Sequence, residues 1–219
     1  VFNYWFWKNK LMDYDKDTWL GFCQYRRYWL KESCDQNLTI TRDNLKENIL
    51  RSIPLAWDSY DAVVAKRTDV SNPKFMKLIK RGFRNILNDP SVIIDKKKQN
   101  IKLHFDMSHG YGKLDKAIDL LDKKERDDFR EYVNKYTYFN PNHMFISHPK
   151  IINEWFKSVF DWFLKCEDIF IFNNLTGYEK RFYGFLGERY LSYWFNKYTN
   201  TIEWPWAFVD MNKGERTDV

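Results

Sequence analysis

Residues 18–29 read TWLGFCQYRRYW, an apolar run that ends in two adjacent arginines. The apolar part is short and follows a polar turn, which is typical of a buried strand. Arg26 and Arg27 come directly after it, and their neighbours are aromatic: Tyr25, Tyr28 and Trp29. Ligands collect at the carboxyl ends of strands in open α/β sheets, and a guanidinium group matches two phosphate oxygens at once. The segment therefore predicts an anion site at a sheet edge, or else an exposed arginine pair bonded to nearby aspartates.

Outward from this segment, short apolar stretches alternate with amphipathic ones. The predicted strands are 61–65, 91–94 and 143–147, and the predicted helices are 41–50, one that starts at Asn72-Pro73, 114–136, 152–163 and 181–198. One face of the helix after Pro73 is expected to carry its apolar side chains: Phe75, Leu78, Ile79, Phe83 and Ile86. Strands that alternate with helices predict an α/β or α+β fold with a central sheet. We expect a single domain over residues 1–219.

Composition limits the function classes. The chain contains 10 Trp, 14 Tyr and 18 Phe, and no apolar stretch approaches the roughly 20 residues that a membrane-spanning helix needs. The net charge of +6 favours phosphate-bearing partners, although a lysine-rich composition without a special partner is the plainer interpretation. Three cysteines, widely spaced, predict neither a disulfide framework nor a zinc site and favour a reducing compartment.

Residues 104–112, HFDMSHGYG, are predicted to form a glycine-containing loop before the helix at Leu114. With Asp115, this segment supplies two histidines and two aspartates, which can hold a metal ion or act as acid and base. The spacing fits no standard zinc motif, and a structural role for the histidines is the alternative. The aspartates of Asp13–Asp17 resemble a metal-binding DxD pattern, but they precede the strand, so we predict a polar turn there and assign no metal ligand.

Two further segments carry polar residues beside predicted elements. Asn142 and His143 follow a turn and lead into a strand, which places them at a sheet edge where they can hydrogen-bond sugar hydroxyls. Arg181, Gly184 and Glu188 share one flank of the last helix. Each of the two glycines in this helix costs about 1 kcal/mol relative to alanine, which is explained if something approaches the backbone closely. Helix packing with surface ion pairs is the alternative.

Together these segments resemble a family of bacterial capsular and exopolysaccharide glycosyltransferases, long catalogued under a domain of unknown function. The matching motifs, in the order of the family, are Tyr4–Asn9 with Leu20–Trp29 (the "YWIWKN … GFCHYRRYF" signature), Ser108-His109 with Leu114-Asp115 ("SH … LD"), Asn142–Ile146 ("NMFI") and Arg181–Arg189 ("R-x-x-GF-x-x-ER"). The motif of a tyrosine and two arginines, of the HYRRYF type, is the most specific of them.

The resemblance implies a GT-A-like fold, a Rossmann-like central mixed sheet flanked by helices. It implies transfer of a hexose, galactose or galactofuranose, from a nucleotide-sugar donor such as a UDP-sugar to a glycan or lipid-linked glycan acceptor of a growing surface polysaccharide. No nucleic-acid partner and a cytoplasmic location, with possible peripheral contact to the inner membrane face, are further expectations. The cofactor stays open, with a divalent cation such as Mn²⁺ or Mg²⁺ as one alternative.

Three departures from the family pattern also set expectations. The family's N-terminal strand region is absent, so we expect an incomplete donor site. Gln24 stands where histidine is usual, and the segment 104–112 differs around its histidine.

The resemblance also implies roles for individual residues. Substrate-binding residues are Tyr25, Arg26 and Arg27 at the diphosphate or donor sugar, His109, Asn142 and Met144 near sugar hydroxyls or phosphate, and Arg181 and Arg189, which steer anions or hold Glu188. The catalytic base is Asp106, Asp115 or Glu188, and spacing does not choose among them. The competing functions are a non-catalytic glycan-binding domain and a basic, aromatic-rich domain that binds nucleic acid.

Overall fold

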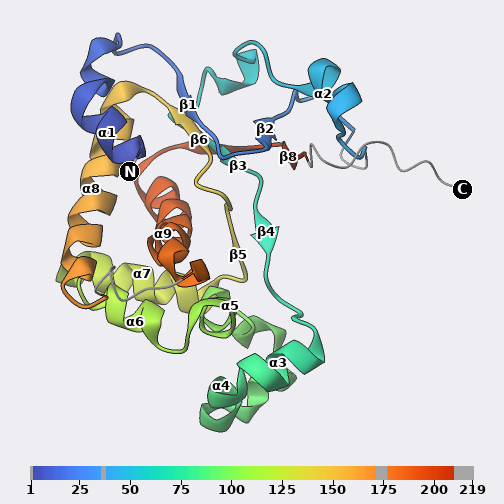
Figure 1. The fold of residues 1–219 in the computed structure, drawn as a ribbon, viewed down its shortest axis with the longest axis vertical. Coiled ribbons are helices and arrows are strands. Elements are labelled where there is room, and N and C mark those ends of the chain that lie inside the picture. Colours follow the sequence, from blue (N-terminus) through green and yellow to red (C-terminus); the bar gives the residue numbers. More distant parts are fainter. Residues whose placement is uncertain (1, 36–37, 171–176, 210–219) are drawn as a thin grey trace, which may run out of the picture.

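A small central sheet with helices around it organises the chain, and the computed structural model describes residues 2–35, 38–170 and 177–209 (Figure 1). The strand order is β1 (Leu20–Phe22), β6 (Phe145–Ser147), β3 (Ala62–Ala65) and β7 (Thr201–Trp204). Strand β6 is antiparallel to β1 and β3, and β3 is parallel to β7. Strands β1, β3 and β7 therefore run the same way and end at one edge of the sheet, which confirms the expected mixed α/β sheet flanked by helices.

Both faces of the sheet are buried at its inner strands, β6 and β3. All four residues of β3 are 0–1% exposed. Because successive side chains of a strand point to opposite faces, Ala62 and Val64 pack with the main helical core, whereas Val63 and Ala65 join a second cluster rich in tryptophan. The tryptophans of that second cluster are Trp29, Trp57 and Trp204. A sheet enclosed on both sides leaves its edges and strand ends as the places where polar groups can act.

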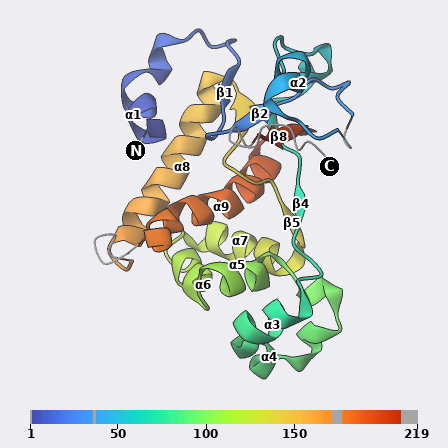
Figure 2. The ribbon, with the colours of Figure 1, turned by 45° about the vertical axis from the view of Figure 1, so that its right-hand side comes forward.

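The other elements surround this sheet. The helices are α1 (Phe2–Asn9), α2 (Arg42–Asn48), α3 (Phe75–Arg81), α4 (Phe83–Asn88), α5 (Ile101–His109), α6 (Lys113–Ile118), α7 (Lys123–Lys135), α8 (Pro149–Glu167) and α9 (Phe182–Tyr198). Two ribbons complete the fold, β2 (Arg27–Trp29) with β8 (Trp206–Phe208) and β4 (Thr68–Asp69) with β5 (Tyr138–Phe139). In two views, α8 and α9 run from the sheet toward α5–α7, and α3 and α4 form the end farthest from it (Figures 1 and 2).

The segment 104–112, predicted to be a loop, lies largely within helix α5. The carboxamide oxygen of Asn100 accepts a hydrogen bond of 3.0 Å from the backbone N–H of Leu103 and so starts the helix. Ile101, Leu103 and Phe105 are all buried, because α5 has neighbours on several sides. Apolar residues at every second position hid the helical period, so the loop prediction was wrong.

Other boundaries also differ from the prediction. Residues 90–93 form a 3-10 helix rather than a strand, since Asp89 accepts a hydrogen bond from the N–H of Ser91 and Pro90 fits the first helical position. The predicted helix 114–136 divides into α6 and α7. Within the described ranges, none of the helices combines the length and the apolar character needed to cross a membrane.

The helix predicted after Pro73 begins later and is divided. Asn72 has a positive φ of 57°, the helix α3 begins at Phe75, and Gly82 separates it from α4. Only part of the predicted apolar face is buried. Leu78 is 2% exposed, but Phe75 and Phe83 are 61% and 56% exposed.

Candidate functional site

The chain turns sharply where β1 ends. Arg26 has a φ of 61°, in the left-handed region that non-glycine residues seldom occupy, and its carbonyl oxygen accepts a 2.9 Å hydrogen bond from the N–H of Val209. Arg27 then starts β2 opposite Phe208 of β8. Both arginines are half-buried, whereas Tyr25 is 78% exposed. Unusual backbone conformations held by their surroundings are found preferentially at functional sites, which draws attention to this turn.

The two arginines make defined contacts at this edge. The Arg26 guanidinium carbon lies 4.9 Å from the centre of the Tyr25 ring, and Arg27 donates a hydrogen bond of 3.2 Å to the Tyr25 carbonyl oxygen. The Arg27 guanidinium also lies 5.4 Å from the ring of Phe208. Phe208 lines a hollow of about 440 Å³ together with Lys66 and Arg67, the two residues that follow β3. Cations from the ends of β1 and β3 therefore lie around the same sheet edge.

A second polar group stands at the ends of β3 and β7. The Nε of Arg67 lies 2.7 Å from the Oε1 of Glu203, and the side-chain amide of Asn140 donates to the same carboxylate at 3.0 Å. Asn140 also donates to the carbonyl oxygen of Ala65, so a buried amide fixes the position of this carboxylate. Lys66, Arg67 and Glu203 were not predicted as site residues. The predicted strand 61–65 already contained the signal, because a cation pair follows its carboxyl end as it does after β1.

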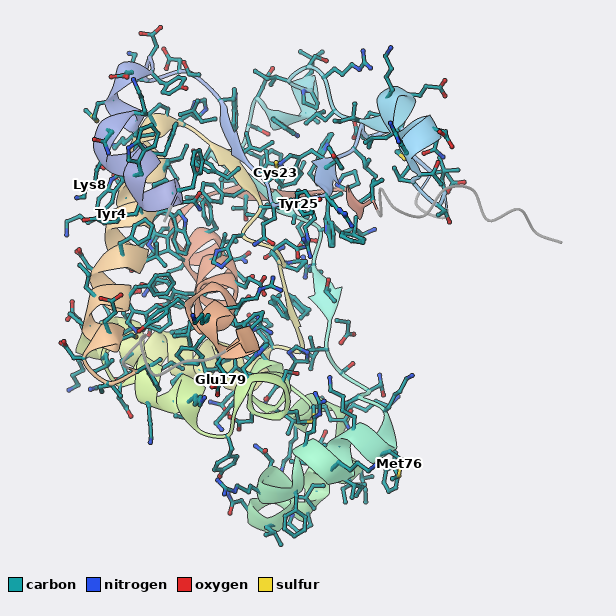
Figure 3. All side chains as sticks on the ribbon, in the orientation of Figure 1. Tyr4, Lys8, Cys23, Tyr25, Met76 and Glu179 are labelled. Atoms are coloured by element: carbon teal, nitrogen blue, oxygen red, sulfur yellow. The ribbon has the colours of Figure 1, made fainter. Side chains whose placement is uncertain are left out.

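A groove of about 930 Å³ opens beside the end of β1. Cys23 and Gln24 line it from the sheet, His143 lines it from the start of β6, and Gly184 lines it from α9. Its opposite walls come from α1 and α8 and are largely aromatic: Tyr4, Trp5, Phe156, Phe160 and Phe163. Figure 3 shows Tyr4 and Lys8 on α1 and Cys23 and Tyr25 just beyond β1. Aromatic walls interspersed with polar side chains suit a ligand that has apolar faces and hydroxyl groups.

His143 is held in this groove by an unusual backbone and a close helix. Asn142 and His143 both have positive φ, 72° and 49°, and His143 Nε2 hydrogen-bonds the carbonyl oxygen of Gly184 at 2.5 Å. Burial lowers the pKa of His143, while the nearby Glu188 carboxylate and this hydrogen bond oppose the shift. The imidazole also lies against Gly187, and this contact explains one of the helix glycines. What approaches the backbone here is a side chain of the protein.

Gly187 and Gly184 allow a matched test of this packing. A Cβ atom on Gly187 would overlap the imidazole of His143 and lie 3.0 Å from the ring of Phe163, whereas a Cβ on Gly184 meets nothing within 4 Å. We expect Gly187→Ala to lower the free energy of unfolding by about 2–3 kcal/mol through overpacking. Gly184→Ala should raise it by roughly 0.5–1 kcal/mol through helix propensity. Urea denaturation measures both, and equal effects of the two substitutions would contradict the packing.

Behind His143 lies a buried charged group. Arg189 is 1% exposed and bonds Glu188 Oε2 at 2.8 Å and His104 Nδ1 at 3.1 Å. Its guanidinium also lies 4.1 Å from the centre of the Phe139 ring. His109, the last residue of α5, stacks on the ring of Phe185 with centroids 3.9 Å apart. Burial, and next the charge of Arg189, lower the pKa of both His104 and His109 to about 3, so both rings are neutral near pH 7.

The three candidate carboxylates differ in their surroundings. Asp106 accepts hydrogen bonds from the N–H of Gly112 at 3.0 Å, Asn85 at 2.8 Å and Lys102 at 2.9 Å. Asp115 lies 3.0 Å from the same Lys102. Burial alone would lower the pKa of Lys102, but these two ion pairs raise it. Both aspartates thus hold the junction of α5 and α6 together, and of the three candidates only Glu188 lies beside His143.

The remaining predicted residues fall in different places. Asn142 is 8% exposed and directly precedes His143, while the side chain of Met144 is fully buried in the tryptophan-rich cluster and supports the sheet. Arg181 is the residue before α9, and its guanidinium lies 5.5 Å from the ring of Phe185. Across the ranges 2–35, 38–170 and 177–209, no three His, Cys, Asp or Glu side chains gather closely enough to hold a metal ion.

Comparisons with known proteins agree with this architecture. The apo structure of WbbM, a bifunctional glycosyltransferase, superposes with a TM-score of 0.67 at 18% identity. The match covers 95% of this chain but only 35% of that protein, so the chain spans about a third of its length. No curated protein matches the sequence. The family model for the domain of unknown function DUF4422 matches residues 2–200, and the chain belongs to that family.

Proposed function

We propose that this domain transfers a sugar from a nucleotide-sugar donor, in the first instance a UDP-sugar, to a glycan or lipid-linked glycan acceptor. The observation that carries the proposal is that cations follow both β1 and β3: Lys66 and Arg67 line a hollow with Phe208, and the Arg27 guanidinium lies 5.4 Å from the Phe208 ring. The fold shared with WbbM, a glycosyltransferase, supports the same class of reaction.

In this proposal Arg26, Arg27 and Lys66 receive the donor diphosphate, and Arg67, which is paired with Glu203, stands beside Lys66. Negative charge grows on the diphosphate as the bond to the sugar breaks, so fixed cations stabilise the transition state more than the bound donor. Arginine forks suit the phosphate oxygens, and the Arg26 guanidinium carbon lies 4.9 Å from the centre of the Tyr25 ring. The exposed ring of Tyr25 is available to stack on the base or on a sugar face.

The acceptor side of the proposal uses the groove beside β1. Aromatic rings from α1 and α8 would contact sugar C–H faces, while Gln24 and His143 would hydrogen-bond hydroxyl groups. Glu188 is the proposed base, because its carboxylate is the one candidate that lies beside His143, whereas Lys102 engages both Asp106 and Asp115. Arg189 lies 2.8 Å from this carboxylate and would hold it in position to accept a proton from the acceptor hydroxyl. We also propose that the transferred sugar is a hexose, galactose or galactofuranose, and that the acceptor belongs to a growing surface polysaccharide.

Ligand-induced thermal stabilisation tests the proposal against its alternatives. UDP at about 100 times its dissociation constant should stabilise the domain by about 2.7 kcal/mol, which raises Tm by roughly 5 °C or more for a chain of this length. Scanning calorimetry would compare UDP, an oligosaccharide and a single-stranded oligonucleotide, each with Mn²⁺, with Mg²⁺ and with a chelator.

Each outcome has a clear meaning. Stabilisation by UDP supports a donor site, and its dependence on the added cation decides whether a metal takes part. Stabilisation by the oligosaccharide alone would indicate a glycan-binding domain. Stabilisation by the oligonucleotide alone, lost at high salt, would overturn the transferase in favour of nucleic-acid binding.

A further inference from the structure

The end of the molecule farthest from the sheet exposes large apolar side chains. On α3 and α4, Phe75 is 61% exposed, Met76 59%, Phe83 56% and Leu87 64%. Figures 1 and 2 place both helices at this end, and Figure 3 shows Met76 pointing outward from α3. We call the exposed side chains of residues 74–87 the α3–α4 surface. Exposed apolar groups gathered on one projecting element mark an interaction site more often than isolated ones do.

The exposed apolar side chains come from both helices. The N–H of Gly82 bonds the carbonyl oxygen of Leu78 at the end of α3, and the N–H of Ile86 bonds the carbonyl oxygen of Gly82 at the start of α4. Phe75 and Met76 therefore lie in the first turn of α3, and Phe83 and Leu87 lie one turn apart on α4. Leu78 and Ile86 point elsewhere and pack in a small core with Leu103 and Met107. The exposed residues are thus not needed to hold the helices on the protein.

The charge of this surface has a single sign. Residues 72–88 contain five cations and no acidic residue. Lys77, Lys80 and Arg84 border a hollow of about 1030 Å³ that they share with Tyr111 and with Asp106, whose buried carboxylate is paired with Lys102. Among the described residues, no carboxylate lies within 4.0 Å of a charged nitrogen of these five side chains. By contrast, α7 carries five cations and four acidic residues over 13 positions, as an ordinary solvated helix does.

We propose that the α3–α4 surface docks the protein on an anionic phospholipid bilayer. Protruding Phe, Met and Leu side chains would enter the boundary between headgroups and acyl chains, and the cations around them would meet the lipid phosphates. Long basic side chains can cover apolar surface while their charges stay at headgroup level. Nucleic acid fits less well, since Met76 and Leu87 offer no ring on which a base can stack. This inference does not rest on the proposed transferase function.

Co-sedimentation with lipid vesicles tests the proposal on the whole chain. We expect binding to vesicles of 30% phosphatidylglycerol in phosphatidylcholine, and weak binding to phosphatidylcholine alone. Lys77→Gln/Lys80→Gln/Arg84→Gln should weaken binding by about 100-fold, since each cation near an anionic surface contributes roughly a factor of five. Phe75→Ser/Met76→Ser/Leu87→Ser should weaken it by about 10-fold or more while retaining the charges.

Matched variants distinguish binding through this surface from non-specific binding through other exposed apolar or basic side chains. Met12→Ser/Ile53→Ser/Leu55→Ser removes side chains of similar or greater exposure elsewhere, and Lys123→Gln/Lys124→Gln/Lys135→Gln removes three cations of α7. Neither control should change vesicle binding, and circular dichroism would confirm that all four variants fold. The proposal is overturned if the wild type does not bind the anionic vesicles or binds neutral ones equally. It also fails if the controls weaken binding as much as the α3–α4 variants, or if an oligonucleotide binds this surface more tightly than the vesicles do.

Discussion

Replacing Arg26 and Arg27 together by alanine is expected to lower the rate of glycosyl transfer by about 10³-fold. Loss of a single fixed group that stabilises developing charge typically costs 10²–10³ in kcat, about 2.7–4 kcal/mol. Both arginine residues are half-buried between β1 and the start of β2, where solvent screens charges less than on an open surface. Variants with a single arginine replaced by lysine should have transfer rates between those of the wild type and the double alanine variant, because lysine keeps the charge but lacks the planar fork.

The measurement is steady-state transfer or donor hydrolysis with a panel of nucleotide sugars. Arg126→Ala/Arg130→Ala is the matched control, since these two arginines form partly exposed ion pairs with Asp127 and Asp119 on or beside α7. The control should retain nearly full activity, because such surface pairs contribute little. If the Arg26/Arg27 double variant keeps full turnover and binds UDP normally, the diphosphate does not lie at this edge.

Acid is expected to destabilise the fold steeply below pH 6.5, through His104 and His109. Both have a pKa of about 3 in the folded chain, against an ordinary value of 6.5. Between these pH values the unfolded chain binds protons that the folded chain excludes. The contribution of the two histidines to the free energy of unfolding is therefore fully present above pH 6.5 and is lost as the pH falls toward 3. After allowance for partial exposure, each histidine should lower the free energy of unfolding by about 1 kcal/mol for each pH unit of acidification. The two together should lower it by about 4 kcal/mol between pH 6.5 and 4.5.

Urea denaturation as a function of pH would measure this slope, with His104→Gln/His109→Phe as the comparison. Glutamine can still accept the hydrogen bond from Arg189, and phenylalanine can still stack on Phe185, so the packing is largely kept while the two titrations are removed. The carboxylates contribute equally to the pH dependence of stability in the wild type and in the double variant. The double variant should therefore lose much less stability on acidification, and parallel curves would show that these histidines are not held neutral.

The sequence was informative where local chemistry and burial point the same way. The run 18–29 predicts a buried strand followed by cations, and the structure contains β1 and the arginine turn there. The amphipathic repeat around Trp155 likewise predicts α8, because only one side of that helix is buried. Predictions of this kind need only the near neighbours of each residue.

Elsewhere the structure depends on contacts between distant segments. Helix α5 is enclosed on several sides, so its apolar residues lose the 3.6-residue period that reveals a surface helix. The need for glycine at position 187 arises from His143, which lies 44 residues earlier and takes an unusual backbone conformation. Lys66 and Arg67 could have been found, since the rule applied to the strand before Arg26 applies equally to the strand before Lys66.

The backbone at Arg26 also shapes what any mutational library at this position will yield. With φ at 61°, glycine fits without strain and asparagine is tolerated, whereas valine and isoleucine oppose the turn whatever their chemistry. Survivors selected for solubility alone should therefore be enriched in glycine and asparagine, while survivors selected for turnover should return to arginine. The two enrichment profiles would separate, at one codon, the demand of the polypeptide from the demand of the reaction.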